Sequence, residues 1–215
     1  LPFPGAHGQQ HWPEGHPECG GRSQSPIDIG TRGGCHLGVP TPTEGRRPPS
    51  RPAAVLELPP SLRIEGLPGN FVAAQLHFHG GRPGRAAGAE HLVDGHRAPA
   101  EVGPDPHPAY DNILNHLGSI RYAGQSVAVP SFGIPELLPP RPDLYYRYNG
   151  SLTTPPCSQS VTWTLFQRPV RIGGQQLEQL QGALYSTPEA EPEPRRLVDN
   201  FRLPQELNQR RVLAS

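Results

Sequence analysis

Two histidines at alternate positions of one predicted strand could bind a metal ion. Residues 71–79 read FVAAQLHFH, and the alternation along this run predicts a β-strand. Residues i and i+2 of a strand point to the same side, so His77 and His79 can present two imidazoles to one ion. A catalytic zinc commonly has three protein ligands and a water molecule. Gln75 shares the histidine face and could orient a ligand ring through its other nitrogen. Without further ligands, the alternative is a pair of ordinary strand histidines.

The elements that would position these residues are mostly strands. Runs rich in β-forming residues predict strands at 54–58, 61–65, 143–148 and 161–166. Apolar residues at i, i+3, i+4 and i+7 from Tyr110 to Leu117 predict a helix, and a weaker stripe from Leu177 to Leu184 predicts a second. There is no internal repeat and no domain-scale linker. We therefore expect one mainly-β domain over residues 1–215, with short surface helices.

The charge balance argues against several classes of partner. The chain carries 19 basic and 19 acidic side chains, for a formal net charge of zero. Such a balance gives no attraction to phosphate backbones or acidic membranes, so we expect no nucleic-acid partner. No apolar run approaches the length of a membrane span, and no signal peptide opens the sequence. Protein partners are not indicated by any motif.

The cysteines and one triplet favour an oxidising compartment. Cys19, Cys35 and Cys157 allow one disulfide and one free thiol, and the sequence alone leaves the pairing open. Asn149-Gly150-Ser151 is an acceptor triplet for N-glycosylation. Together these features predict a glycoprotein of the secretory pathway or the cell exterior.

Five motifs in a fixed order resemble the α-class carbonic anhydrases. They are SQSPIDI at 23–29, QLHFH at 75–79, Glu90-His91, YNGSLTTPPCSQSVTW at 148–163 and VDNFR at 198–202. The resemblance covers nearly the whole chain and is greatest to the extracellular, membrane-tethered branch. It implies a central, twisted, mostly antiparallel sheet and a disulfide between Cys19 and Cys157. It also implies Zn²⁺ as the cofactor and the reversible hydration of carbon dioxide to bicarbonate as the reaction.

The resemblance also implies roles for individual residues. His77 and His79 match two of the three zinc ligands. Thr153 matches the threonine that orients the zinc-bound hydroxide, and Glu90 matches the glutamate that accepts the threonine proton. Gln75, Glu101 and Asn200 match residues that orient the ligand histidines. Thr154, Leu152 and Trp163 match the substrate pocket, and Ser25-Pro26 and Pro155-Pro156 match cis peptide bonds.

The third zinc histidine has no counterpart where the family has it. Ala100-Glu101 runs directly into Val102-Gly103, so a block of a few dozen residues with the ligand strand and another core strand is missing. His107 lies among three prolines, which cannot form an interior strand. The spacing of His91 and His96 does not direct them to the metal. We therefore expect an incomplete zinc site.

Three functional hypotheses follow from this incomplete match. The first is a zinc carbonic anhydrase whose activity is impaired by the missing ligand. The second is a non-catalytic, carbonic-anhydrase-related domain that acts in binding or adhesion outside the cell. The third is a truncated product that does not fold stably, because the loss of core strands exposes unpaired backbone and apolar faces.

Overall fold

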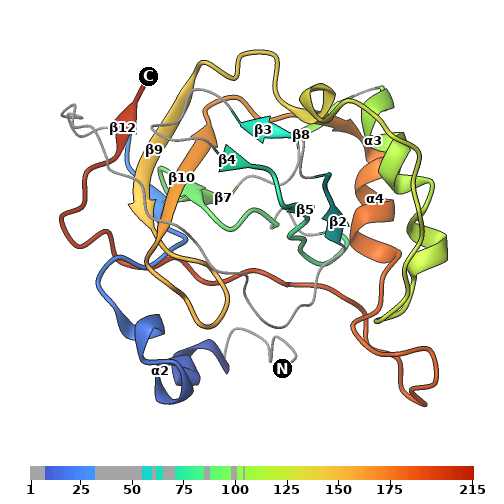
Figure 1. Cartoon of the computed structure of the whole chain (residues 1–215), viewed down its shortest axis with the longest axis horizontal. Coiled ribbons are helices and arrows are strands. Elements are labelled where there is room, and N and C mark those ends of the chain that lie inside the picture. The colour runs from blue at the N-terminus through green and yellow to red at the C-terminus, as the bar shows by residue number, and fades with distance from the viewer. Residues whose placement is uncertain are drawn as a thin grey trace.

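The computed structural model describes residues 8–31, 55–59, 62–64, 71–84, 88–97, 101–103 and 105–215, and Cys35 lies outside these ranges. Strands predominate, and the helices are short (Figure 1). The order of elements is η1 (Gln9–His11), α2 (Trp12–Gly15), η2 (Pro17–Gly20), β1 (Asp28–Ile29), β2 (Val55–Glu57), β3 (Arg63–Ile64), β4 (Phe71–Val72), β5 (Gln75–His77), β6 (Leu92–Val93), β7 (His96–Arg97), β8 (Glu101–Gly103), α3 (Pro108–Leu114), η3 (Leu117–Ile120), η4 (Ile134–Leu137), β9 (Tyr145–Gly150), β10 (Val161–Phe166), β11 (Arg171–Gly173), α4 (Gly174–Gly182) and β12 (Leu213–Ala214). The prediction of a mainly-β fold with short helices is confirmed.

The longest ladder joins β9 and β10. The two strands are antiparallel, with Trp163 opposite Tyr148, and β12 pairs with the other edge of β9. The β-branched and aromatic residues of VTWTLF favour this extended conformation. The prediction of a strand at 161–166 is confirmed to the residue, and the strand predicted at 143–148 begins and ends two residues later.

The other described strands form four smaller sheets. β2 pairs with β5 and β3 pairs with β4, both antiparallel, whereas β8 and β11 are parallel. The fourth of these sheets has three strands in the order β1-β6-β7, in which β1 and β6 are parallel. Antiparallel pairs outnumber parallel ones, as predicted. The described strands nevertheless lie in separate sheets of two or three strands, and they do not form one continuous ladder.

The run at 71–79 is divided into two short strands, β4 and β5. Ala73 N donates to Leu62 O, whereas Leu58 N donates to Ala74 O. The run therefore pairs with β3 in its first part and with β2 in its second part. Pro59 lies in the partner segment between β2 and β3, and a proline cannot donate to a ladder. The partner strand is interrupted there, and the run at 71–79 is interrupted opposite it.

Among the described residues, two clusters of buried side chains contribute to the core. The first is built from Ile27, Ile29 and Tyr148, with Trp163 packed against it. The second is built from residues of α3 and η4 and contacts Leu76 and Phe78 from the strand run. Leu76 and Phe78 thus lie on the apolar face that the alternation predicts, while Gln75 and His77 are exposed.

The two longest helices lie together at one side of the molecule, next to β2 and β5 (Figure 1). Both helices were predicted, although α3 ends at Leu114, before the last apolar residue of its stripe. Gln176 of α4 joins them, because its amide donates to His107 O and to Asp111 Oδ1 at 2.9 and 2.7 Å. Within the described part of the chain, none of the helices has the length and apolar character that a membrane crossing requires.

Candidate metal centre

The strand run brings the two predicted zinc ligands together. His77 is the last residue of β5 and His79 follows two residues later. Their ring centroids are 5.0 Å apart with the rings at 70°. His77 is partly exposed, although protein atoms cover much of its ring, and only 17% of the His79 side chain is accessible. Burial lowers the pKa of His77, and the nearby His79 lowers it further, so the neutral form that binds metals is favoured.

The protein holds one nitrogen of His79. The Nδ1 atom of His79 is 2.5 Å from the backbone oxygen of Asn200. A carbonyl oxygen can only accept, so Nδ1 carries the proton and Nε2 has the free lone pair. The Asn200 side chain supports this arrangement by accepting from Gly80 N and donating to Phe78 O. Asn200 therefore contacts His79 through both its backbone carbonyl and the backbone groups that its side chain holds on either side of that histidine.

Glu90 lies on the same side of His79. Its Oε1 atom is 3.5 Å from His79 Nδ1 and accepts a hydrogen bond from Arg202 N at 3.1 Å. Glu90 is 7% exposed, and Thr153 is buried to the same degree. The two side chains share no hydrogen bond in the described part of the chain, so the predicted link between Thr153 and Glu90 is not formed here.

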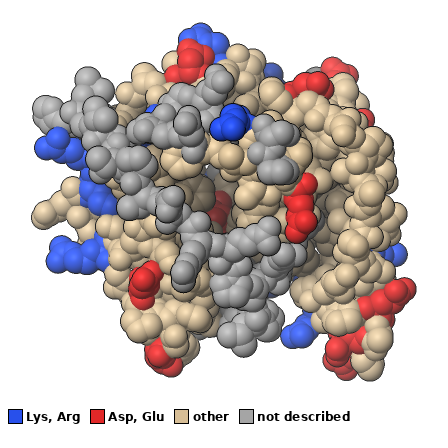
Figure 2. Space-filling view, viewed as in Figure 1, with Lys and Arg blue, Asp and Glu red and all other residues tan. Residues whose placement is uncertain are grey.

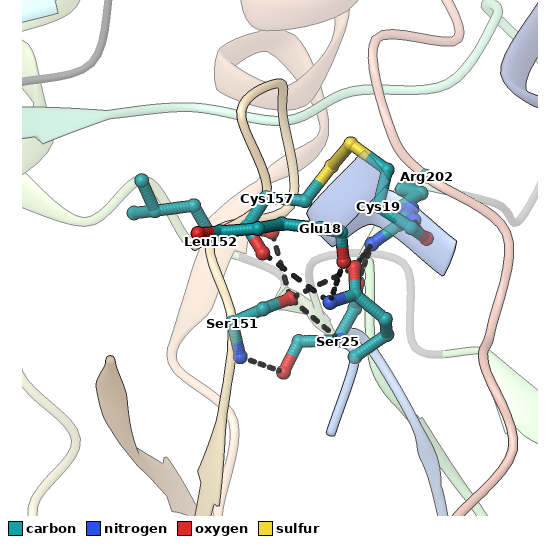
Figure 3. The surroundings of a disulfide bond; sticks show 8 residues. Glu18, Cys19, Ser25, Ser151, Leu152, Cys157 and Arg202 are labelled. Carbon is teal, nitrogen blue, oxygen red and sulfur yellow. Dashed lines mark hydrogen bonds between the residues drawn. A yellow bond between two sulfur atoms is a disulfide. The ribbon is translucent and has the colours of Figure 1, made fainter. Parts of the chain in front are cut away.

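The loop that carries Thr153 and Thr154 is closed by backbone hydrogen bonds and a disulfide. Leu152 N donates to Ser158 O, and Cys157 N donates to Thr154 O. Cys157 is bonded to Cys19 across 138 residues of sequence (Figure 3), which confirms the predicted pairing. The cis peptide bonds at Ser25-Pro26 and Pro155-Pro156 are also present, as predicted.

His91, Tyr148 and Ser25 form a buried group of polar side chains that sequence reasoning did not find, and Trp163 packs against it. The ring of His91 packs against Trp163 at 4.7 Å between centroids, and His91 Nε2 is 2.7 Å from the Tyr148 hydroxyl. The same hydroxyl is 2.7 Å from Ser25 Oγ. Burial, and to a smaller extent the nearby His79, lower the pKa of His91 to about 3, so this histidine is neutral. The signal in the sequence is that His91 directly follows Glu90.

Arg202 is a second residue that sequence reasoning missed. It is 3% exposed and donates to Gln24 Oε1, Ser25 O and Cys19 O at 2.7 to 3.0 Å (Figure 3). Burial lowers its pKa to about 10, although the nearby Glu90 opposes this shift. The guanidinium joins the disulfide segment to the C-terminal segment that carries Asn200. Arg202 thus positions the backbone behind both Glu90 and His79.

Three further predicted residues form no hydrogen bond or ion pair with His79, Glu90 or Asn200 among the described atoms. Gln75 is exposed on β5, and its side chain makes no hydrogen bond with any described residue. Glu101 begins β8 and pairs with Arg171; its side chain lies outside the described atoms. Asn149 is exposed on β9, as a glycosylation acceptor must be.

The donor set tests whether the site suits a catalytic zinc. His77 and His79 are suitable ligands individually, since imidazole nitrogen is a preferred zinc donor. A catalytic zinc needs three protein ligands, and the described residues contain no group of three or more His, Cys, Asp or Glu placed to hold an ion. The described residues therefore do not fit a complete catalytic zinc site.

Charged side chains are scattered over the face of the molecule in Figure 2. Among the residues coloured there, neither the acidic nor the basic side chains form a continuous field. Such a surface has no strong long-range attraction for polyanions or polycations.

The fold and the site define a mainly-β protein with two strand histidines, one of them held by a backbone carbonyl and a buried glutamate. A model of the eukaryotic-type carbonic anhydrase family matches residues 101–215. Carbonic anhydrase 12 of Homo sapiens is 36% identical over 253 residues, covering 98% of this chain and 72% of the relative. Carbonic anhydrase 6 of Canis lupus familiaris is 31% identical, covering 84% and 70%, and carbonic anhydrase 15 of Mus musculus is 32% identical, covering 97% and 80%. The chain therefore belongs to the eukaryotic-type carbonic anhydrase family, which is a family of lyases.

The alignment also bears on the missing block. The comparison with carbonic anhydrase 12 spans 253 residues, more than the 215 residues of this chain. The relative therefore has a few dozen residues without a counterpart here. The family match begins at Glu101, the residue after which the sequence motif is interrupted.

Proposed function

We propose that this chain is a zinc carbonic anhydrase by function, with the reversible hydration of carbon dioxide to bicarbonate and a proton as its reaction. The observation that carries the proposal is the environment of His79. The Asn200 carbonyl and Glu90 fix its Nδ1 side, which leaves Nε2 available beside the ring of His77. Because the chain belongs to the carbonic anhydrase family, we interpret this histidine pair as zinc ligands.

In this proposal the residues around the pair have separate tasks. His77 and His79 would hold Zn²⁺, which would supply an activated water when bound. Thr153 and Glu90 would position the reacting group. Thr154, Leu152 and Trp163 would line the carbon dioxide pocket, and Gln75, Glu101 and Asn200 would orient the ligand histidines. The burial of Glu90, Thr153 and Asn200 supports their part of this assignment.

The two-histidine donor set limits the rate that we expect. With two imidazoles, zinc is held weakly and more of its positions are left to water, which disturbs the geometry that sets the acidity of bound water. We therefore propose a low turnover for this chain. The same observation favours the second candidate function, a non-catalytic binding domain of the carbonic anhydrase family.

The cellular setting and the domain organisation are also part of the proposal. The Cys19–Cys157 disulfide indicates an oxidising compartment, and the exposed Asn149 could carry a glycan. We propose an extracellular or secretory location and a single carbonic anhydrase domain over residues 1–215.

A metal-binding and activity assay separates the two candidates. Zinc affinity would be measured by calorimetry and carbon dioxide hydration by stopped flow, for the wild type and for His79→Ala. The proposal expects zinc binding and a low hydration rate that are both lost in His79→Ala. The matched control is His96→Ala, an exposed histidine of the β7 strand, which should change neither. A folded wild type that binds no zinc and hydrates no carbon dioxide would reject the enzyme and favour the binding domain.

A further inference from the structure

The strand β5 has a free edge next to the candidate metal centre. It pairs with β2 in antiparallel register, and among the described residues its other edge has no strand partner. Leu58 N donates to Ala74 O, which fixes the phase of the ladder, so the backbone groups of Ala74 and Leu76 point to β2. The N–H and C=O groups of Gln75 and His77 therefore point to the free edge, where no described residue bonds to them.

The edge on the β2 side is used along its whole length. Where β2 ends, the Asn200 side chain continues the pairing, because it donates to Phe78 O and accepts from Gly80 N. On the free edge, the chain at Gly88 approaches beyond β5, where a Cβ placed on Gly88 would lie 3.8 Å from His79 O. A row of unpaired backbone groups such as the one on β5 is a template for a further strand.

Apolar space lies beside the same segment. A cavity of about 380 Å³ is lined by Phe78, His79, Gly80 and Asn200, and by apolar side chains of α4 and η3. None of the described residues that line it is Asp, Glu, Lys or Arg. The cavity is thus part of the candidate metal centre, and it suits apolar side chains, since a charged group would lose its hydration there without a counter-charge.

The two faces of β5 specify the side chains of a strand added to it. Leu76 and Phe78 lie on the apolar face, whereas Gln75 and His77 lie on the other. Residues opposite each other in neighbouring strands share a face, so the added strand must alternate apolar and polar side chains. One of the polar side chains would lie beside His77. The two-histidine centre lacks a third donor, and an imidazole at that place would match it.

The comparison with a relative supports a polypeptide as the occupant. Carbonic anhydrase 12 has a few dozen residues without a counterpart in this chain, which is more than one strand requires. The free edge and the missing length therefore agree, because the chain has a place for a strand and lacks the residues to form it.

We propose that the free edge of β5 binds an extended segment of another polypeptide by strand addition, and that this segment alternates apolar side chains with an imidazole beside His77. The backbone groups of Gln75 and His77 form the hydrogen bonds, and the cavity accepts apolar side chains of the segment. The imidazole preference rests on the proposed function, in which His77 and His79 hold Zn²⁺. The strand pairing does not depend on it.

The probe is the synthetic peptide KVHVTVK, acetylated and amidated at its ends, which carries valine on one face and histidine and threonine on the other. Calorimetric titration of the metal-free full chain should show saturable binding of one peptide per chain. With zinc present, the peptide affinity should rise at least about tenfold, because the imidazole joins the histidine pair. The peptide KVAVTVK, which has alanine in place of histidine, should bind the metal-free chain equally well and show no such rise.

Two substitutions of Gln75 provide the matched comparison. Gln75→Pro removes the N–H that faces the free edge and places the proline ring there, so peptide affinity should fall at least about tenfold. Gln75→Thr changes the same side chain but keeps the N–H, and the affinity should stay within about twofold of the wild type. Circular dichroism and urea unfolding of both variants check that the fold is retained.

Three outcomes would overturn the inference. One is the absence of saturable peptide binding to the metal-free wild type, even where that protein binds zinc as the proposed function expects. Another is equal affinity of Gln75→Pro and Gln75→Thr, since the peptide would then pair with another edge, such as that of β10. The third is a dimer of the wild type in sedimentation that Gln75→Pro dissociates, because the edge would then pair with a second copy of this chain.

Failure of the proposed function has a different signature. A wild type that binds the peptide but no zinc would reject the zinc enzyme and the imidazole preference. It would support the strand pairing, because that part is measured without metal.

Discussion

The Nε2 atom of His91 lies 2.7 Å from the hydroxyl oxygen of Tyr148, in the core behind the candidate metal centre. His91 is 9% exposed and Tyr148 is 2% exposed. Burial raises the pKa of Tyr148 and lowers that of His91, so both rings are neutral. The pair joins the sheet of β9 and β10 to the segment that carries Glu90, and its neutrality makes stability depend on pH.

Acid should destabilise the folded state through His91. Its pKa falls from the ordinary 6.5 to about 3 on folding, so between these values the unfolded chain binds the extra proton. The stabilisation is complete above 6.5 and is lost as the pH falls toward 3. At about pH 4.5 the loss should be about 2–3 kcal/mol. Urea unfolding at about pH 7.5 and about pH 4.5 measures it: His91→Gln should flatten the pH dependence by that amount. His96→Gln, at an exposed histidine, should not, and equal slopes for all three proteins would contradict the prediction.

Replacement of Arg202 should cost far more stability than replacement of an exposed arginine. Arg202→Met leaves Cys19 O and Ser25 O without their donor and removes one of the two donors to Gln24 Oε1, which should cost about 3 kcal/mol or more. Arg82→Met removes an exposed pair with Asp199 and should cost less than about 1 kcal/mol. Chemical denaturation of the two variants provides the comparison. Similar losses in both would show that the buried guanidinium does not anchor this segment.

Removal of the disulfide should lower the free energy of unfolding by roughly 2–5 kcal/mol. The bond between Cys19 and Cys157 closes 138 residues of sequence, so it strongly restricts the unfolded chain. The double variant Cys19→Ala with Cys157→Ala leaves no unpaired thiol at either position. Denaturation curves of the wild type and the double variant measure the difference. An unchanged midpoint would mean that the surrounding hydrogen bonds alone hold this segment.

Asn149 should be glycosylated when the chain passes through the secretory pathway. The residue is exposed on β9 and begins an Asn-Gly-Ser triplet. Expression in secreting cells should give a protein whose gel mobility increases after enzymatic removal of N-glycans. Asn149→Gln should abolish this shift, whereas Asn115→Gln, at an exposed asparagine outside any acceptor triplet, should retain it. A wild type without the shift would reject the prediction.

Strands and helices were predicted well where the residues of the element itself determine its conformation. All residues of β10 except Leu165 are β-branched or aromatic, and the strand was predicted to the residue. The apolar stripe of α4 predicted a helix, although its end at Gly182 precedes Leu184. The break between β4 and β5 was not predicted, because it depends on the interrupted partner strand at Pro59 and not on the run itself.

The resemblance to a family predicted more residues of the candidate site than the spacing of residues along the chain did. It paired Cys19 with Cys157, which the structure confirms, and it assigned Asn200 to the surroundings of His79, where the Asn200 carbonyl contacts His79 Nδ1. It did not predict that Glu90 would bond to Arg202 N in place of Thr153. That choice depends on how closely the C-terminal segment approaches Glu90, which no motif encodes.

The sequence by itself determined the class of this protein: a mainly-β carbonic anhydrase relative with two strand histidines and no third histidine in the family position. Residue types, alternation and motif order are properties of the chain, so they can be read before folding. Only the tertiary structure decided which nitrogen of His79 is free and which arginine is buried beside the disulfide. These depend on contacts between segments far apart in sequence, where burial and hydrogen-bond geometry set the energies.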